Sequence, residues 1–281
     1  MTDLERLLAL VPPPAAPVGA GAGWTRAEDA LGVALPREFT EIARRYGRGT
    51  FCDEFSCHTP ELMIEENPGR LEDLRFLLRD DGADCPHPVH PEPGGLLVWG
   101  SDSIGGALCW LTEPAGSPDR WPTVRWTRDD EFEYPEGGTA AVLTGLTEDL
   151  TARMAESGAD VDGPWFDPDR RDVHVYLRLT EVDGAPPYPE RLRILRRSLA
   201  PTGARGGFTG AGGARQDHFA TAAGRWRLTY ETAYGHQIRV AYPPGEDAPV
   251  RAALLAAVDA MGCRVESVLP VHGTPHWPGT T

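Results

Sequence analysis

The sequence predicts an α+β protein made of two domains. Amphipathic helical patterns dominate the first 46 residues, and continuous apolar runs typical of buried strands follow from residue 96. A polar, glycine-containing stretch at 156–164 separates these from strictly alternating strands and further helices. Helices followed by a meander of strands favour an α+β sandwich, and the second change of pattern indicates a second domain.

Two short helices are expected first. Residues 2–10 carry leucines on one side and are followed by three prolines, which end the helix. The next helix has Thr25 as a good N-cap, with Glu28 three residues later as in a capping box. Gly32 is a natural residue to end it.

The stretch LGVALPREFTEIARRYGRGTF, residues 31–51, predicts a third helix and the start of a strand. Pro36 suits the first turn of this helix, and Gly47 stops it. The residues that recur at helical spacing should be buried: Phe39, Ile42, Ala43 and Tyr46.

A meander of strands completes the first domain. Residues 96–99 are continuously apolar, as in a strand buried on both faces, and a glycine-containing turn leads to a return strand at 107–111. A further strand and a closing helix are expected to complete this order. Three tryptophans are expected in this core: Trp24, Trp99 and Trp110.

The second domain is predicted to have the order β-α-β-β-(β)-α-β, which suggests a smaller, ferredoxin-like two-layer sandwich. Residues 158–164 are the expected linker, so the domains are 1–157 and 165–281. The stretch PTGARGGFTGAGGA at 201–214 is expected to be a loop. The regular elements are strands at 173–179, 215–222, 225–233, 236–242 and 264–269 and helices at 187–199 and 249–261.

A family resemblance accompanies these patterns. It begins with Trp24, Glu28 and the stretch at 31–51. It continues through three later segments: GGLLVWGSDSIGGALCWL at 94–111, RWPTVRW at 120–126 and EFEYPEGGTAAVLTGLTEDL at 131–150. In this order they resemble the SUKH superfamily, the Smi/Knr-like proteins, over residues 20–155. The resemblance implies a strand at 120–126 and a closing helix after Ala140. Residues 52–93 match no pattern of the family, and the second domain resembles no family. The resemblance implies a SUKH-like sheet-and-helix domain and a binding function, because many bacterial members look like immunity proteins against co-encoded polymorphic toxins.

Composition limits the partners. The 281 residues include 42 Asp or Glu against 27 Arg and no Lys, a net charge of −15. An acidic surface repels phosphate backbones and suits a basic protein, so we expect no nucleic-acid partner. The N-terminus lacks the basic region of a signal peptide and no apolar run could span a bilayer, so we expect a cytoplasmic protein without a membrane partner. Five cysteines, an odd number, argue against structural disulfides.

A zinc site is one chemical hypothesis for the unmatched insertion. Thiolates and imidazoles bind zinc when four of them converge. The spacings Cys-x4-Cys and Cys-x-His-x2-His match no standard finger, so we expect ordinary half-buried side chains, with zinc as the alternative. The residues are Cys52, Cys57, His58, Cys85, His87 and His90.

Other patterns give no catalytic site or cofactor. The glycine-rich stretch lacks the lysine that a phosphate-binding P-loop needs. A second pattern, on the predicted strands, comprises His174, His218, Glu231 and His236. These could supply an acid–base pair, but no nucleophile motif accompanies them. The arginines expected on the solvated face of the 187–199 helix are Arg191, Arg193, Arg196 and Arg197.

The densest acidic run, at 129–136, is a candidate binding surface because aromatic residues lie within and beside it. Aromatic anchors ringed by charge are the usual anatomy of an interface hot spot. The predicted partner-binding residues are Trp121, Trp126, Asp129, Asp130, Glu131, Phe132, Glu133 and Tyr134, with Asp80 and Asp81 if the fold brings them near.

We therefore expect a bacterial immunity protein, not an enzyme, that neutralises a basic toxin domain by occluding it. One alternative is a non-catalytic regulatory or scaffolding module. Another is an enzyme with its site in the C-terminal domain. The patterns leave open the toxin's identity, the role of residues 165–281 and the oligomeric state.

Overall fold

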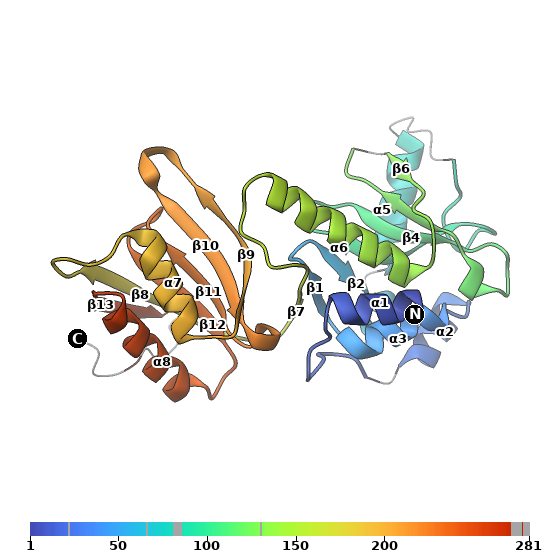
Figure 1. Ribbon diagram of the computed structural model, residues 1–281. Coiled ribbons are helices and arrows are strands. Elements are labelled where there is room, and N and C mark those ends of the chain that lie inside the picture. The colour runs from blue at the N-terminus through green and yellow to red at the C-terminus, as the bar shows by residue number, and fades with distance from the viewer. Residues whose placement is uncertain (22, 66, 81–85, 130, 271–276, 278–281) are drawn as a thin grey trace. The chain divides into compact units, whose positions relative to one another are not determined.

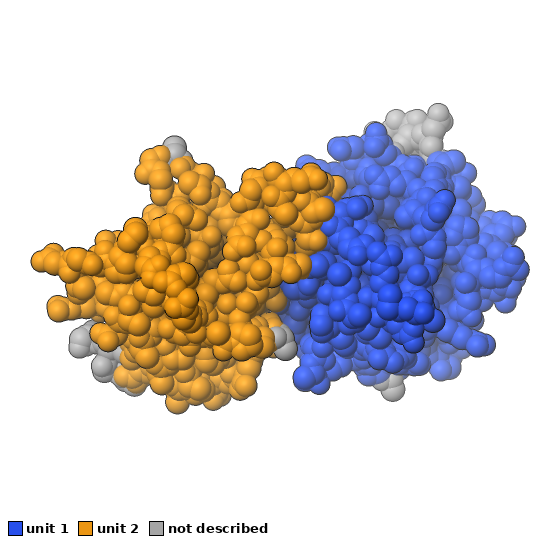
Figure 2. All heavy atoms as spheres, in the orientation of Figure 1, with its two compact units in different colours: residues 1–150, 164–169 blue, residues 151–163, 170–281 orange. Residues whose placement is uncertain are grey.

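The computed structural model describes residues 1–21, 23–65, 67–80, 86–129, 131–270 and 277, and it has an α+β fold with two compact units (Figure 2). Unit 1 comprises Met1–Leu150 and Pro164–Asp169, and unit 2 comprises Thr151–Gly163 and Arg170–Thr281. The division differs from the predicted one, because most of the expected linker belongs to unit 2 and Pro164–Asp169 returns to unit 1.

Unit 1 is built on a seven-stranded antiparallel sheet with the order β6-β5-β4-β3-β2-β1-β7 (Figure 1). Its strands are β1 (Gly49–Phe51), β2 (Phe55–Cys57), β3 (Leu96–Asp102), β4 (Ala107–Leu111), β5 (Thr123–Trp126), β6 (Phe132–Glu133) and β7 (Phe166–Pro168). The strands expected at 96–99, 107–111 and 120–126 are present as β3, β4 and β5. β7 comes from the second, short segment of the unit and pairs with β1.

Among the described residues, five helices lie wholly in unit 1, and a sixth, α6, begins there and ends in unit 2. They are α1 (Asp3–Leu10), α2 (Trp24–Leu31), α3 (Arg37–Tyr46), α4 (Pro60–Glu65), α5 (Asn67–Asp80) and α6 (Thr139–Glu156). The predicted N-terminal helices and the closing helix are all found. Two helices, α4 and α5, lie in the insertion for which the sequence offered no pattern.

The capping box expected at α2 is wrong, and one exists at α1 instead. Helix α2 begins at Trp24, and its N-cap residue Gly23 gives no side-chain bond. Glu28 instead accepts the backbone N–H of Leu35 through Oε1, at 2.9 Å, and so fixes the chain entering α3. At α1, Thr2 and Glu5 cap each other's backbone N–H groups.

Helix α3 forms the centre of the unit 1 core. All four residues expected to face inward are buried. The ring of Phe39 lies edge-on to that of Trp110, with centroids 4.8 Å apart, and Trp110 stacks on Trp99 at 5.7 Å. The three tryptophans predicted for the core are buried: Trp24, Trp99 and Trp110.

Unit 2 is built on a six-stranded antiparallel sheet with the order β13-β8-β12-β11-β10-β9. The strands are β8 (Val173–Glu181), β9 (Thr202–Thr209), β10 (Arg215–Thr221), β11 (Arg227–Glu231), β12 (Gln237–Tyr242) and β13 (Cys263–Pro270). Helix α7 (Tyr188–Ser198) connects β8 to β9, and α8 (Asp247–Ala260) connects β12 to β13. The two helices lie side by side on one face of the sheet (Figure 1).

The glycine-rich stretch expected to be a loop is mostly strand, because residues 202–209 form β9 at the sheet edge. Glycine is needed there because β9 and β10 approach each other closely. A Cβ at Gly207 would lie 2.6 Å from the carbonyl oxygen of Gln216 on β10. Gly206 has a φ of +106°, which side chains disfavour, at the point where the pairing register shifts.

The core of unit 2 lies between its helices and one face of its sheet. Alternate residues of β8, Val175, Leu177 and Leu179, are buried there, as the alternation predicted. On the opposite face Arg239 makes an ion pair with Glu231, and its guanidinium lies 5.5 Å from the ring centre of Tyr176.

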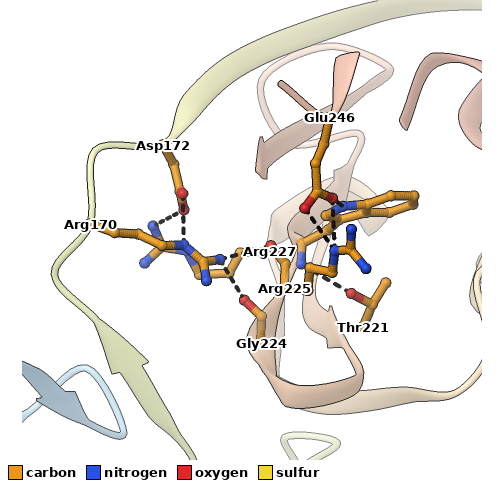
Figure 3. A network of polar contacts seen from close by, with 8 residues as sticks. Arg170, Asp172, Thr221, Gly224, Arg225, Arg227 and Glu246 are labelled. Carbon is orange, nitrogen blue, oxygen red and sulfur yellow. Dashed lines mark hydrogen bonds and ion pairs between the residues drawn. The ribbon is translucent and has the colours of Figure 1, made fainter. Parts of the chain in front are cut away.

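A polar network fastens the start of β8 to the turn between β10 and β11 (Figure 3). Arg170 and Arg227 bind the two oxygens of Asp172 at 2.8 and 2.9 Å. Arg170 also donates to the carbonyl of Gly224 at 2.9 Å. The network therefore connects segments more than 50 residues apart in the chain.

Among the described residues, no helix combines the length and the apolar character needed to cross a membrane.

Candidate protein-binding site

The predicted binding residues fall mainly on the β5–β6 hairpin, at one end of the unit 1 sheet (Figure 1). Trp126 pairs across the strands with Phe132, and Arg125 pairs with Glu133. No further strand pairs with β6 among the described residues, so this hairpin is the sheet's edge. We call residues 126–129 and 131–136 the acidic edge.

Aromatic rings form a ridge on the acidic edge. Trp126 stacks on Phe132 with centroids 6.3 Å apart and planes within 10°. His87 approaches both Phe132, at 6.5 Å, and Tyr134, at 5.7 Å, and its Nε2 lies 2.9 Å from the Tyr134 hydroxyl. Tyr134 is 53% exposed. The ridge therefore offers a large, supported aromatic ring to a partner.

His87 is a member of this ridge that the sequence did not reveal. It lies 47 residues before Tyr134, and only the fold brings them together. Burial lowers the pKa of His87 below its usual range, which favours a neutral ring beside the tyrosine.

Exposed carboxylates alternate with the aromatic residues along the hairpin, and Glu133 pairs with Arg125 on the face opposite to Phe132. Asp129, Glu131 and Glu133 are exposed. Arg125 neutralises part of this charge, since its two terminal nitrogens lie 3.1 Å from Glu133 and 3.4 Å from the buried Asp102. The exposed acids outnumber that arginine, so the surface stays acidic.

Several predicted binding residues lie elsewhere or outside the described residues. Trp121 is only 6% exposed and donates its indole N–H to the carbonyl of Pro114 at 3.1 Å, so it belongs to the core and not to the binding surface. Asp81 and Asp130 lie outside the described residues, and Asp80 is the last residue of α5.

The negative charge of the protein is concentrated in unit 1. Unit 1 has 12 Arg against 29 Asp or Glu, a net charge of −17, whereas unit 2 has 15 Arg against 13, a net charge of +2. A basic partner would be attracted to unit 1 specifically. The total of −15 conceals this division.

The Cys/His insertion gives no metal cluster within the described part of the chain, where no three His, Cys, Asp or Glu side chains are positioned to share an ion. Cys52 and Cys57 are buried, and burial raises the pKa of the Cys57 thiol to about 12. His90 bonds the carbonyl of Leu31 through Nε2 at 2.8 Å. His58 is buried, His87 belongs to the aromatic ridge, and Cys85 lies outside the described residues.

The strand residues of unit 2 considered for acid–base chemistry have separate partners. Glu231 is fully buried and bound by Arg239 and by Gln216, whose Nε2 lies 3.2 Å away. His236 meets the hydroxyl of Tyr230 at 2.9 Å and not Glu231. His218 bonds Thr229 across the strands, and His174 faces Ala241 in the pairing register.

All four arginines of α7 were expected on its solvated face, but not all of them lie there. Arg191 is 4% exposed and pairs with Glu181. Arg193 pairs with Glu190 on the helix surface, as predicted. Arg196 reaches two acids beyond its own helix, Asp160 and Asp162, and Arg197 is exposed.

Comparison of the chain with models of known protein families, with curated proteins and with solved structures gave no match.

Proposed function

We propose that this protein is a bacterial, cytoplasmic immunity protein of the SUKH superfamily that neutralises a co-encoded toxin by binding and occluding it. Unit 1 would be the SUKH-like domain, on the strength of the resemblance carried by Trp24, Glu28 and residues 31–51. Unit 2 would be a ferredoxin-like sandwich with a longer meander. Helical crossovers before and after β9–β12 are compatible with that reading.

The observation that carries the proposal is the acidic edge. It joins a half-exposed tyrosine, Tyr134, to a stacked Trp126–Phe132 pair, and it lies in a unit with a net charge of −17. Interfaces obtain most of their affinity from a few buried aromatic anchors, and charge complementarity adds encounter rate and specificity. A basic active-site cleft is the surface that this combination fits best.

The mechanism is occlusion. Unit 1 attracts the toxin over a distance of about 10 Å, the screening length near 0.1 M salt. The aromatic ridge then enters the cleft, and carboxylates of the acidic edge pair with the cationic groups that would otherwise hold the toxin's substrate. No covalent step is needed, so the protein acts stoichiometrically.

The test begins with the products of the reading frames next to this gene. Each is expressed in a sensitive bacterium with and without this protein. We expect one of them to stop growth and this protein to restore it. If none is toxic, or the protein does not protect, the immunity function is wrong; binding of a non-toxic neighbour would favour the scaffolding alternative.

Matched charge reversals then locate the interface. Changing Asp129, Glu131 and Glu136 to Arg should slow association with the toxin at least ~10-fold at low salt and reduce its salt dependence. The control variant changes Asp29, Glu61 and Glu65 to Arg; these are exposed acids of unit 1 outside the acidic edge. It has the same net charge as the first variant but should keep most of the association rate. Equal effects of the two triple variants would show that general charge, and not this edge, matters.

A further inference from the structure

Unit 2 contains a cavity of about 440 Å³ that the toxin-binding proposal does not use. One wall is residues 157–160, which follow α6. The other is the β9–β10 hairpin, through Gly207, Phe208, Arg215 and Asp217 among others. The volume lies within the range of small-molecule sites, roughly 300–1,000 Å³.

The walls of the cavity are held in place by specific bonds. The backbone N–H of Gly206 donates to the carbonyl of Asp160 at 2.8 Å, and that of Ala204 donates to the Asp162 carboxylate at 2.6 Å. Arg196 of α7 binds both acids, Asp160 at 2.9 Å and Asp162 at 3.0 Å. The segment that follows α6 is therefore tied to β9 and α7, so the cavity is formed before any ligand arrives.

Small residues keep the cavity open. Gly158 and Ala159 line one wall, and Gly207 lies opposite Asp217 across the β9–β10 pair. A Cβ at Gly207 would meet the carbonyl of Gln216 at 2.6 Å and Oδ1 of Asp217 at 3.0 Å. The space beside the Asp217 carboxylate thus depends on glycine.

Two opposite charges lie side by side in this cavity. Arg215 and Asp217 are two residues apart on the same face of β10, with Nη2 and Oδ2 separated by 3.9 Å. This separation is longer than a direct hydrogen bond. The side chains of Arg215 and Asp217 are 33% and 13% exposed, and both line the cavity. Both groups therefore keep bonding capacity for a ligand.

Tyr188 fixes both charged groups. The guanidinium of Arg215 lies 4.8 Å from the centre of its ring, which is stacked in turn on Tyr230 at 4.6 Å. The Tyr188 hydroxyl lies 2.7 Å from Oδ2 of Asp217. Burial, reinforced by this hydrogen bond, raises the pKa of Tyr188 above its usual range, so the hydroxyl stays protonated between two acceptors, the carboxylate and the carbonyl of Tyr230 at 2.8 Å.

We propose that this cavity binds a small zwitterion, namely an α-amino acid with an apolar side chain. Its carboxylate would pair with Arg215, whose planar fork suits that group, and its ammonium group would pair with Asp217. The side chain would lie near Phe208 and Ala159. A polyanion such as a nucleotide is disfavoured, because the Asp160 and Asp217 carboxylates also line the cavity. The proposal rests on unit 2 alone and is independent of toxin binding.

Calorimetric titration of the full-length protein tests the ligand class. Leucine and phenylalanine are the probes, and leucinamide and N-acetylleucine each lack one of the two charges. We expect saturable binding of at least one amino acid and at least ~10-fold weaker binding of both derivatives, since each loses a charge-assisted bond. No saturable binding of either amino acid at millimolar concentration, or equal binding of a derivative, would overturn the proposal.

Variants assign the binding to this cavity. Arg215→Gln and Asp217→Asn each remove one charge. The Asn side chain can still accept the hydrogen bond of the Tyr188 hydroxyl, so Asp217→Asn should leave the local fold unchanged. Ala159→Phe fills the space without changing charge. Each should weaken binding at least ~10-fold. Arg264→Gln and Asp259→Asn, at exposed sites of unit 2, are the matched controls. Full affinity in all three cavity variants, or equal losses in the controls, would rule out this site.

Discussion

Asp172 has no exposed side-chain surface, and Arg170 and Arg227 bind its two oxygens (Figure 3). Asp172→Ala would leave two guanidinium groups without their shared carboxylate. Breaking a fully buried ion pair costs several kcal/mol of unfolding free energy. Both arginines retain some exposure, so we expect a smaller loss of unfolding free energy, roughly 2–4 kcal/mol. Urea denaturation of the full chain measures it.

The matched control is Asp169→Ala, which removes an exposed carboxylate 2.7 Å from Arg48. Ion pairs of this kind contribute ~1 kcal/mol or less. If both alanine variants lose the same small amount, Asp172 does not stabilise unit 2 in the way its burial implies.

His236 makes unit 2 sensitive to acid. Burial lowers its pKa below the usual 6.5, and Arg191 lowers it further, while Glu181 opposes both. As pH falls below about 6.5, the unfolded chain takes up a proton that the folded chain does not, so stability must decrease. Burial raises the pKa of Tyr230, whose hydroxyl therefore stays protonated and can donate to the neutral imidazole at 2.9 Å.

His236→Gln should therefore reduce the loss of unfolding free energy between about pH 7.5 and pH 5.5. Urea titrations at the two pH values measure this slope. His218→Gln, at an exposed position of the same sheet, is the control. A slope unchanged by His236→Gln, or changed equally by His218→Gln, would assign the acid sensitivity to other groups.

At single residues, the sequence predicted burial well where a period was clear. Phe39 and Ile42 followed from helical spacing. Trp121 and Arg191 did not, because their burial depends on neighbours supplied by other elements: Trp121 bonds Pro114, and Arg191 bonds Glu181. His87 likewise joins the candidate site only through a contact 47 residues away in the chain.

The ends of α2 and α3 differ in how strictly they require glycine. Gly32 and Gly47 have nearly equal φ angles, +71° and +68°, but ψ is 15° at Gly32 and −156° at Gly47. Nothing lies within 4 Å of a Cβ at Gly32, whereas a Cβ at Gly47 would be 2.3 Å from the carbonyl oxygen of Val18. Gly32→Ala should cost about 1 kcal/mol from backbone strain alone.

Gly47→Ala should cost more, in total roughly 3 kcal/mol or more, because the backbone conformation of Gly47 is essentially confined to glycine and because the added methyl group would meet Val18. Thermal unfolding of both variants, monitored in unit 1 by tryptophan fluorescence, measures the difference. Equal costs would mean that neither the backbone conformation of Gly47 nor the contact with Val18 adds strain.

For whole elements, long patterned segments were predictable and short strands were not. Helix α3 and strand β3 have enough residues to display their periods. β1, β2 and β7 have three residues each, too few to show alternation, so only the sheet reveals them. β9 was read as a loop because its glycines signal flexibility, although here they allow two strands to approach closely.

At the scale of the molecule, the sequence predicted two domains but not the path of the chain between them. The chain passes between the units after Leu150, after Gly163 and after Asp169. The polar stretch at 156–164 resembles a linker in composition, yet it forms part of a wall in unit 2. Composition cannot show that a short segment pairs with a distant strand.

This path predicts that a fragment of residues 1–169 is more stable than one of residues 1–157. The longer fragment keeps β7, whose Phe166 lies 5.1 Å from Tyr46 and 4.9 Å from Phe51 between ring centres. Loss of a buried phenylalanine side chain costs roughly 3–5 kcal/mol. Urea unfolding compares the two, and equal midpoints with equal slopes would mean that β7 adds little to unit 1.

The three passages of the chain between the units also bear on how such a gene could change over generations. A single recombination breakpoint after Leu150 would deliver unit 1 without β7. One after Asp169 would deliver unit 2 without the segment that lines its cavity and pairs with β9. No single exchange keeps both units intact, so the two halves are expected to diversify by point substitution together and not by the shuffling of cassettes.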